Sequence, residues 1–233
     1  VVYNWGGAAT HRSELGPVRI NLIGNYYICG PVKKSRRVFR EDDPAVTKLF
    51  YDGNYLDADR DAEHDGTEIV GEEAVAEGYA GFTSEDELIG PQQGKPYRFI
   101  GTLADQRVSA PKAYERVVNS AGCSLHRDAI DAALIEQLQR REGQLIDSQE
   151  ELRRPDGVLA GLDDLPTVHR PDDFDTDGDG MADEFERDHG LNPADPADGN
   201  GRELSRDGYT NLEFYLNWLL MPADKRVAFS AGQ

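Results

Sequence analysis

The sequence predicts a mainly β fold, in which rungs of a parallel β-helix are followed by α-helices and a tail of loop and helix. Three observations lead to this fold: short apolar strands that end in asparagine and an aromatic residue, two segments with a helical pattern, and an aspartate-rich loop before a short helix. We expect four parts along the chain. They are rungs and loops at 1–110, a helical segment packed on the coil at 111–152, a linker at 153–171 and the loop-and-helix tail at 172–233.

The first part repeats a strand that ends in asparagine. The segments VVYNW, NLIGNYY and LFYDGNYL carry Asn4, Asn25 and Asn54, at intervals of 21 and 29 residues. A period of about 20 to 30 residues with one strand per repeat is typical of a solenoid. In a parallel β-helix equivalent side chains stack, so we expect these asparagines to form an amide ladder. The alternative is three unrelated strands of a β-sandwich, each entering a turn that contains asparagine.

Two helices are expected between the rungs and the tail. Residues 111–122 begin with proline and end with glycine, as helices often do. Residues 127–143 place four apolar side chains on one face and also end at a glycine. These side chains are Ile130, Ala133, Leu134 and Leu138. The segment GQLIDS predicts a short strand after this helix, and 57–95 predicts surface loops with one short strand.

Residues 175–186, DTDGDGMADEFE, fit the spacing of a twelve-residue calcium loop with Gly180 at the turn position. The expected ligands are Asp175, Asp177, Asp179, the Met181 backbone carbonyl, Asp183 and Glu186. The alternative is a solvated acidic turn. A helix is expected only after the loop, ending at Gly190, because Pro166 and Pro171 interrupt the preceding segment. We therefore interpret the loop as a calcium staple and not as a calcium sensor.

A second, looser calcium site is a further hypothesis for the tail. Its expected ligands are Asp198, Asn200, Asp207, the Tyr209 carbonyl and Asn211. With Gly208 as the turn glycine, the last loop position falls on Phe214, which cannot bind a metal. Thr210 and Glu213 have the spacing of a capping box, so Glu213 is equally well explained as a helix cap.

The charge of the chain favours divalent cations as partners. A formal net charge of -19 at pH 7 argues against nucleic acid and against an anionic membrane surface, which would both repel the chain. The sequence also has no apolar run long enough to cross a bilayer. Its two cysteines, Cys29 and Cys123, could form one disulfide or remain two buried thiols.

The open end of the first rung raises the question of what covers it. A solenoid does not leave an apolar rung exposed, because an uncovered strand edge invites association. We therefore expect a missing N-terminal segment, or another chain, to lie against Val1.

Three segments, in this order, resemble pectate lyase-like proteins of the polysaccharide lyase family 1 type. They are VVYNWGGAATHRSELGPVRINLIGNYYICGP, AYERVVNSAGCSLHRDAIDAALIEQL with GQLIDSQEEL, and DTDGDGMADEFERDHGLNPADPADGNG with DGYTNLEFYLNWL. The resemblance implies the C-terminal rungs of a right-handed parallel β-helix with a tail that carries an EF-hand-like calcium loop. It also implies a secreted, extracellular protein and calcium-dependent β-elimination of polygalacturonate, an acidic polysaccharide.

The resemblance carries over no catalytic residue. The family's arginine motif is absent from this chain and is expected upstream of Val1, so the resemblance leaves open whether the chain is an enzyme. Arg12 and Arg19 are candidates for lining a substrate groove, and the alternative is that they pair with Glu14 and other surface carboxylates. An alternative function is a calcium-stapled extracellular structural or fibre-forming protein without catalysis.

Overall fold

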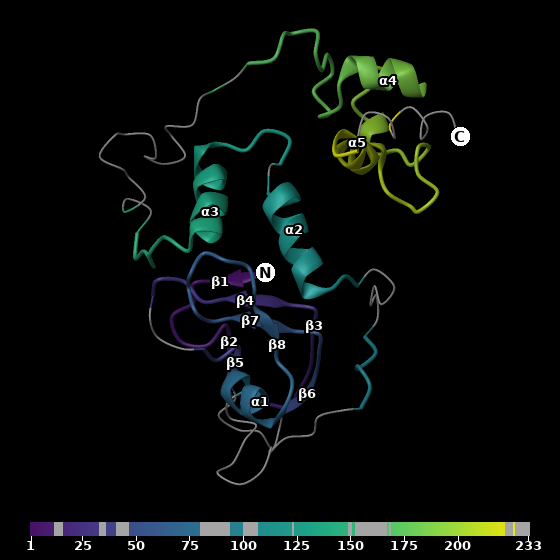
Figure 1. The fold of residues 1–233 in the computed structure, drawn as a ribbon. Helices are drawn as coiled ribbons and strands as arrows, with labels where there is room; N and C mark the ends of the chain where they lie inside the picture. The colour runs from purple at the N-terminus through teal and green to yellow at the C-terminus, as the bar shows by residue number, and fades with distance from the viewer. Residues whose placement is uncertain are drawn as a thin grey trace. The chain divides into compact units, whose positions relative to one another are not determined.

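The chain divides into two compact units, Val1–Leu165 and Pro166–Gln233, and their boundary falls inside the segment 153–171. Residue placements are described for the greater part of both units in this computed structural model. The described residues are 1–11, 16–32, 36–40, 47–79, 94–99, 107–122, 124–148, 151, 167, 169–221 and 226. All strands found among these residues belong to the first unit (Figure 1).

The described strands are short and form three small sheets. They are β1 Val2–Tyr3, β2 Thr10–His11, β3 Val18–Ile23, β4 Tyr26–Ile28, β5 Phe39–Arg40, β6 Thr47–Asp52, β7 Tyr55–Asp57 and β8 Thr67–Glu68. One sheet has the order β1-β4-β7-β8, and the other two pair β2 with β5 and β3 with β6. No described strand exceeds six residues, and the helices hold more of the described residues. The described fold therefore combines short strands with helices and has a modest strand content, while the β-helix remains a prediction.

Strand pairing is parallel except between β7 and β8. The same offset of 29 residues relates β2 to β5, β3 to β6 and β4 to β7, as in the pairs Val18↔Thr47 and Tyr26↔Tyr55. The pairing of β1 with β4 has a shorter offset, as the pair Val2↔Tyr27 shows. Two successive stretches of the chain thus run side by side, strand for strand.

Two of the three repeated asparagines are equivalent in the structure. The side-chain amide of Asn25 donates to Oδ1 of Asn54 at 2.9 Å, and the Asn54 amide donates to the Leu22 carbonyl at 2.8 Å. The expectation for Asn4 was wrong. Strand β1 pairs with β4, which begins after Asn25, so Asn4 does not lie opposite Asn25. Instead, Oδ1 of Asn4 accepts from the Val32 amide at 3.0 Å.

The described helices are α1 Glu72–Gly78, α2 Ala110–Ser120, α3 Ala129–Arg140, α4 Asp183–His189 and α5 Asn211–Leu219, with a 3-10 turn, η4, at Asp198–Asn200. Both helices expected between rungs and tail are confirmed as α2 and α3. On α3, however, Leu134 is 53% exposed, while Ala133 and Leu138 are buried. The capping box of Thr210 and Glu213 is confirmed at the start of α5.

Two local expectations differ from the structure. The segment GQLIDS is not a strand: Leu145 and Ile146 are exposed, so no neighbouring strand covers them. The region 57–95 contains α1 as well as the expected short strand, β8. A seven-residue helix flanked by glycines is too short to show a clear apolar period.

Each unit has its own apolar core. In the first, one cluster includes Trp5, Tyr27, Phe39 and Tyr79, and a second includes Tyr26, Ile28 and Leu138. The core of the second unit is built from Met181, Phe185, Leu204, Phe214 and Tyr215. Neither unit's described helices are long and apolar enough to cross a membrane.

Candidate metal centre

The loop 175–180 is folded by hydrogen bonds from its own backbone to its aspartates. The Asp175 carboxylate accepts from the amides of Gly178 at 2.8 Å and Gly180 at 3.1 Å. Both glycines have positive φ, 76° and 96°, a conformation that residues with a Cβ rarely adopt. The fold of the loop thus follows from the alternation of aspartate with small residues.

Asp177 and Asp179 each keep one carboxylate oxygen unoccupied. Oδ1 of Asp177 accepts from the Asp179 amide at 3.2 Å, and Oδ1 of Asp179 accepts from the Met181 amide at 2.8 Å. The Oδ2 atoms of both residues are buried and have no hydrogen-bond partner among the described residues. Buried carboxylate oxygens without a donor are costly unless a cation meets them.

Glu186, on α4, is the most deeply buried acidic side chain among the described residues of this unit. Its exposed fraction is 0%, and neither carboxylate oxygen has a hydrogen-bond partner in the described part of the chain. Burial, together with the negative charges of Asp179 and Asp177, raises the pKa of Glu186 to about 7. Burial and the negative charges of Asp177, Asp175 and Asp198 raise the pKa of Asp179. A divalent cation at this position would reverse both effects.

The acidic side chains form two groups that share one member. Oxygens of Asp175, Asp177 and Asp179 lie within 4.8 Å of one another, and so do oxygens of Asp179, Glu186 and Asp198. Carboxylates at this spacing are able to bind a hard divalent cation such as Ca²⁺, which takes six to eight oxygen ligands. The sequence predicted four of these five carboxylates in the first loop, and it assigned Asp198 to a different site.

Asp183 and Met181 have other contacts. The Asp183 carboxylate accepts from the amide and the hydroxyl of Thr176, both at 2.8 Å, and these bonds lower its pKa. Asp183 thus closes the loop and lies outside both acidic groups. The Met181 side chain is fully buried in the core, and ligation by its carbonyl remains a prediction.

The residues expected at the second calcium site serve different roles. Asn211 is fully buried; its amide donates to the Asp198 carbonyl and to Glu203, both at 2.8 Å, and its Oδ1 accepts from the Leu204 amide. Asn200, Asp207 and Tyr209 are exposed. Asp198 lies with Glu186 in the second acidic group, so a separate second site remains a prediction.

The remaining sequence candidates lie in the first unit. Arg19 is exposed, with its guanidinium 5.8 Å from the centre of the Tyr97 ring. Cys29 is buried, and burial raises the pKa of its thiol. Arg12, Glu14 and Cys123 lie outside the described residues, so the groove and the disulfide remain predictions.

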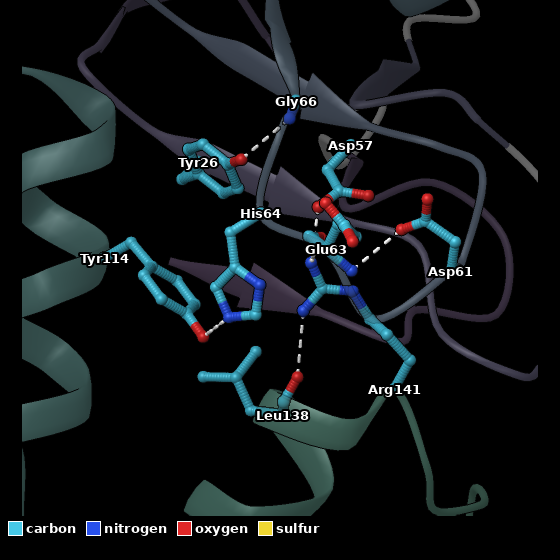
Figure 2. Close-up of polar contacts among 9 residues, drawn as sticks. All are labelled: Tyr26, Asp57, Asp61, Glu63, His64, Gly66, Tyr114, Leu138 and Arg141. Atoms are coloured by element: carbon cyan, nitrogen blue, oxygen red, sulfur yellow. Dashed lines mark hydrogen bonds and ion pairs between the residues drawn. The ribbon is translucent and has the colours of Figure 1, made fainter.

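A buried arginine that the sequence reasoning missed joins α3 to β7 (Figure 2). Arg141 caps the C-terminus of α3 in a left-handed conformation and donates to the Leu138 carbonyl at 2.9 Å. It also donates to the Asp57 carboxylate and, at 2.6 Å, to the Glu63 carbonyl. Both charged side chains are at most 2% exposed. Burial raises the pKa of Asp57 above its usual value, although the opposing charge of Arg141 partly offsets this.

Aromatic residues line this arginine cluster on the side of α2. Tyr114 of α2 contacts His64, and the Tyr26 hydroxyl accepts from the Gly66 amide at 2.9 Å (Figure 2). Tyr26 stacks on Tyr55 with ring centres 6.0 Å apart. The only sequence signal was a basic residue at the end of a helix, which is common at surfaces, so the pairing with Asp57 could not be foreseen.

Comparison with known proteins gives one consistent relationship. The chain is 32% identical over 224 residues to a protein named probable pectate lyase C from Neosartorya fischeri. The aligned region covers 94% of this chain and 47% of that protein. The corresponding protein of Aspergillus fumigatus gives the same values, and that of Emericella nidulans is 29% identical over 224 residues and covered to 46%. This supports the resemblance to pectate lyase-like proteins.

The chain spans about half the length of these curated relatives. No protein-family model matches it. No solved structure matches it either. The relationship therefore rests on sequence similarity over nearly the whole of this chain.

Proposed function

We propose that this chain is the C-terminal portion of a secreted, extracellular pectate lyase-like protein that acts on or binds an acidic polysaccharide. The observation that carries the proposal is the 32% identity over 224 residues to a probable pectate lyase C. The reaction proposed by resemblance is β-elimination in polygalacturonate. A base removes the proton at C5 of the uronate, the C4–O bond breaks, and a C4–C5 double bond forms in the new end.

The proposed architecture of the first unit is a right-handed parallel β-helix. It is supported by the shared 29-residue offset of three strand pairs and by the bond between Asn25 and Asn54. In such a coil each rung contributes one strand to each sheet, so strand pairs at one offset are expected. The change of offset at β1 marks a rung of different length.

Calcium is the proposed cation of the second unit. The acidic groups around Asp179 offer only oxygen ligands, which Ca²⁺ prefers. Glu186 has no basic partner in the described part of the chain, and a bound ion would supply the missing positive charge. Its proposed role is to hold the tail together, and no step of the lyase reaction is assigned to this ion.

The lyase proposal is tested by following unsaturated uronate released from polygalacturonate, with calcium and with excess chelator. The protein is assayed alone and with any segment or chain that co-purifies with it, beside the Neosartorya fischeri relative. Calcium-dependent release supports the proposal. Absence of release from this and other acidic polysaccharides, in every form, contradicts catalysis.

Binding is tested separately by electrophoresis in gels that contain polygalacturonate. Arg19, exposed beside Tyr97, is proposed to contact the uronate carboxylates together with Arg12. Retardation that falls in Arg19→Ala and persists in the control Arg36→Ala supports this groove. Arg36 is a suitable control because, like Arg19, it is exposed, and it pairs with Glu77 at 3.3 Å.

A structural role without catalysis is the second candidate, and one observation favours it. Among the described residues, β1 is the end strand of its sheet, and β2 and β3 each belong to a two-stranded sheet. Each therefore has an edge at which another chain, or a preceding segment of the same chain, is able to pair. Regular fibres by electron microscopy support assembly, and monodisperse monomers count against it.

A further inference from the structure

Three carboxylates from different parts of the second unit meet at one point. They belong to Asp179 in the loop, Glu186 on α4 and Asp198 on η4, and one oxygen of each lies within 4.8 Å of the others. Asp198 lies outside the twelve-residue loop, and the spacing rule for such loops gives it no place. The question is what holds three negative charges this close together.

The geometry of each side chain directs an oxygen toward the others. Asp198 accepts from the Asn192 amide through Oδ2 at 2.8 Å, which leaves Oδ1 buried without a partner. Asp179 accepts from the Met181 amide through Oδ1, which leaves its Oδ2 buried without a partner among the described residues. Glu186 is fully buried with both oxygens unpartnered among the described residues. The arrangement is an incomplete oxygen cage and not a set of solvated surface charges.

Opposite charge is not supplied by a neighbouring side chain in the described part of this unit. The nearby ion pair, Arg187 with Asp183 at 3.4 Å, involves neither Glu186 nor Asp198. Three close carboxylates with buried oxygens repel one another strongly unless they are protonated or a cation lies between them. At neutral pH a bound cation resolves this most completely.

The backbone is also shaped for close approach. A Cβ atom added at Gly199 would lie 2.4 Å from Oδ2 of Asp179, closer than real Cβ contacts. Glycine therefore lets the η4 backbone come against the loop carboxylate and brings the neighbouring Asp198 within reach. The Asn211 amide holds the Asp198 carbonyl at 2.8 Å and ties this turn to the first residue of α5.

We propose that Asp198 is a calcium ligand which, with Asp179 and Glu186, binds a cation that cross-links the loop and α4 to η4 and the start of α5. This inference rests on the calcium binding proposed above. It gives Asp198 a role at the first loop that the loop motif does not contain. Asp183, bonded to Thr176, closes the loop and lies outside both acidic groups.

The test is calorimetric titration of metal-stripped protein with calcium chloride. Asp198→Ala is expected to lower the affinity by at least about tenfold, or to remove one bound ion per chain. Asp195→Ala is the matched control, since Asp195 is exposed, lies in the same turn and also accepts one backbone amide, that of Ala197. Unchanged affinity and stoichiometry in Asp198→Ala overturn the inference. Absence of binding by the unaltered protein instead overturns the calcium proposal itself.

Hydrogen exchange separates ligation from a purely local packing role. Calcium is expected to slow amide exchange in Asn211–Leu219 in the unaltered protein and in Asp195→Ala, but not in Asp198→Ala. Equal slowing in all three proteins contradicts the cross-link. If Asp198→Ala does not fold, Asp198→Asn decides, because it keeps the shape and removes one charge: weaker binding supports ligation, and unchanged binding overturns it.

Discussion

Both units of this protein bury a carboxylate, and they neutralise it in different ways. In the first unit Asp57 meets the guanidinium of Arg141, with both side chains at most 2% exposed. In the second unit Glu186 is fully buried beside other carboxylates, and its oxygens lack a donor among the described residues. The first unit supplies its own counter-charge, whereas the second is proposed to take one from solution as a bound cation.

The hydrogen bonding of particular buried side chains in the two units shows a similar contrast. Asn54 of the first unit is 2% exposed; its amide donates to the Leu22 carbonyl and the Tyr79 hydroxyl, and its Oδ1 accepts from Asn25. In the second unit the buried Oδ2 atoms of Asp177 and Asp179 are left without donors in the described part. A difference in dependence on calcium between the two units follows directly.

The largest expected effect is on the first unit. Arg141→Met keeps much of the side-chain volume but leaves Asp57 buried without its counter-charge, which should lower the free energy of unfolding by about 3–5 kcal/mol. Urea unfolding followed by Trp5 fluorescence in a Trp218→Phe background measures it. Arg140→Met is the control, because its exposed pair with Glu136 should contribute less than about 1 kcal/mol. Equal losses of unfolding free energy in the two variants would show that the buried pair stabilises the unit no more than the exposed pair does.

Calcium removal should act on the second unit alone. At a calcium concentration a thousandfold above Kd, binding stabilises the folded unit by about 4 kcal/mol, and chelation removes this. Thermal unfolding followed by Trp218 fluorescence in a Trp5→Phe background should show the loss, together with faster proteolysis near 165–215. Trp5 in the reciprocal background should report no change. If a strong chelator changes the unfolding reported by neither tryptophan, the two units do not differ in their dependence on calcium.

A pH effect is expected next, in the metal-free protein. Because the pKa of Glu186 is raised from 4.5 to about 7, the folded unit binds its proton more tightly than the unfolded chain does. The contribution of Glu186 to stability is therefore greatest below pH 4.5, falls as the pH rises from 4.5 to 7, and is flat above. Urea unfolding across this range checks the slope, and Glu186→Gln should remove it. A slope that persists in Glu186→Gln assigns the effect to another group.

The smallest expected effect concerns the helix that the cation is proposed to anchor. The Thr210 hydroxyl accepts from the Glu213 amide at 3.2 Å, and Glu213 accepts from the Thr210 amide at 2.8 Å. Thr210→Ala should cost about 1 kcal/mol in the second unit, measured by urea unfolding with calcium present. Thr210→Ser, which keeps the hydroxyl, should restore most of it. A cost in Thr210→Ser equal to that in Thr210→Ala would exclude the cap as the cause.

The sequence by itself determined the features that depend on near neighbours. The loop at 175–186, the end of α4 at Gly190 and the capping box of α5 were all read from spacing. Their hydrogen bonds join residues two to seven positions apart, such as the Gly180 amide with Asp175 and the Thr176 amide with Asp183. Local geometry of this kind is set by residue type and spacing, so tertiary structure adds little to it.

Only the tertiary structure decided the contacts between distant segments. The pair of Asp57 and Arg141 spans 84 positions, and neither residue carries a local mark of its partner. The register that separates Asn4 from Asn25 and Asn54 depends on which strand β1 joins. Asp198 reaches Glu186 because Gly199 and Asn211 position the turn that carries it. Such partners are chosen by packing and by the neutralisation of buried charge, which act through space and leave no fixed spacing in the sequence.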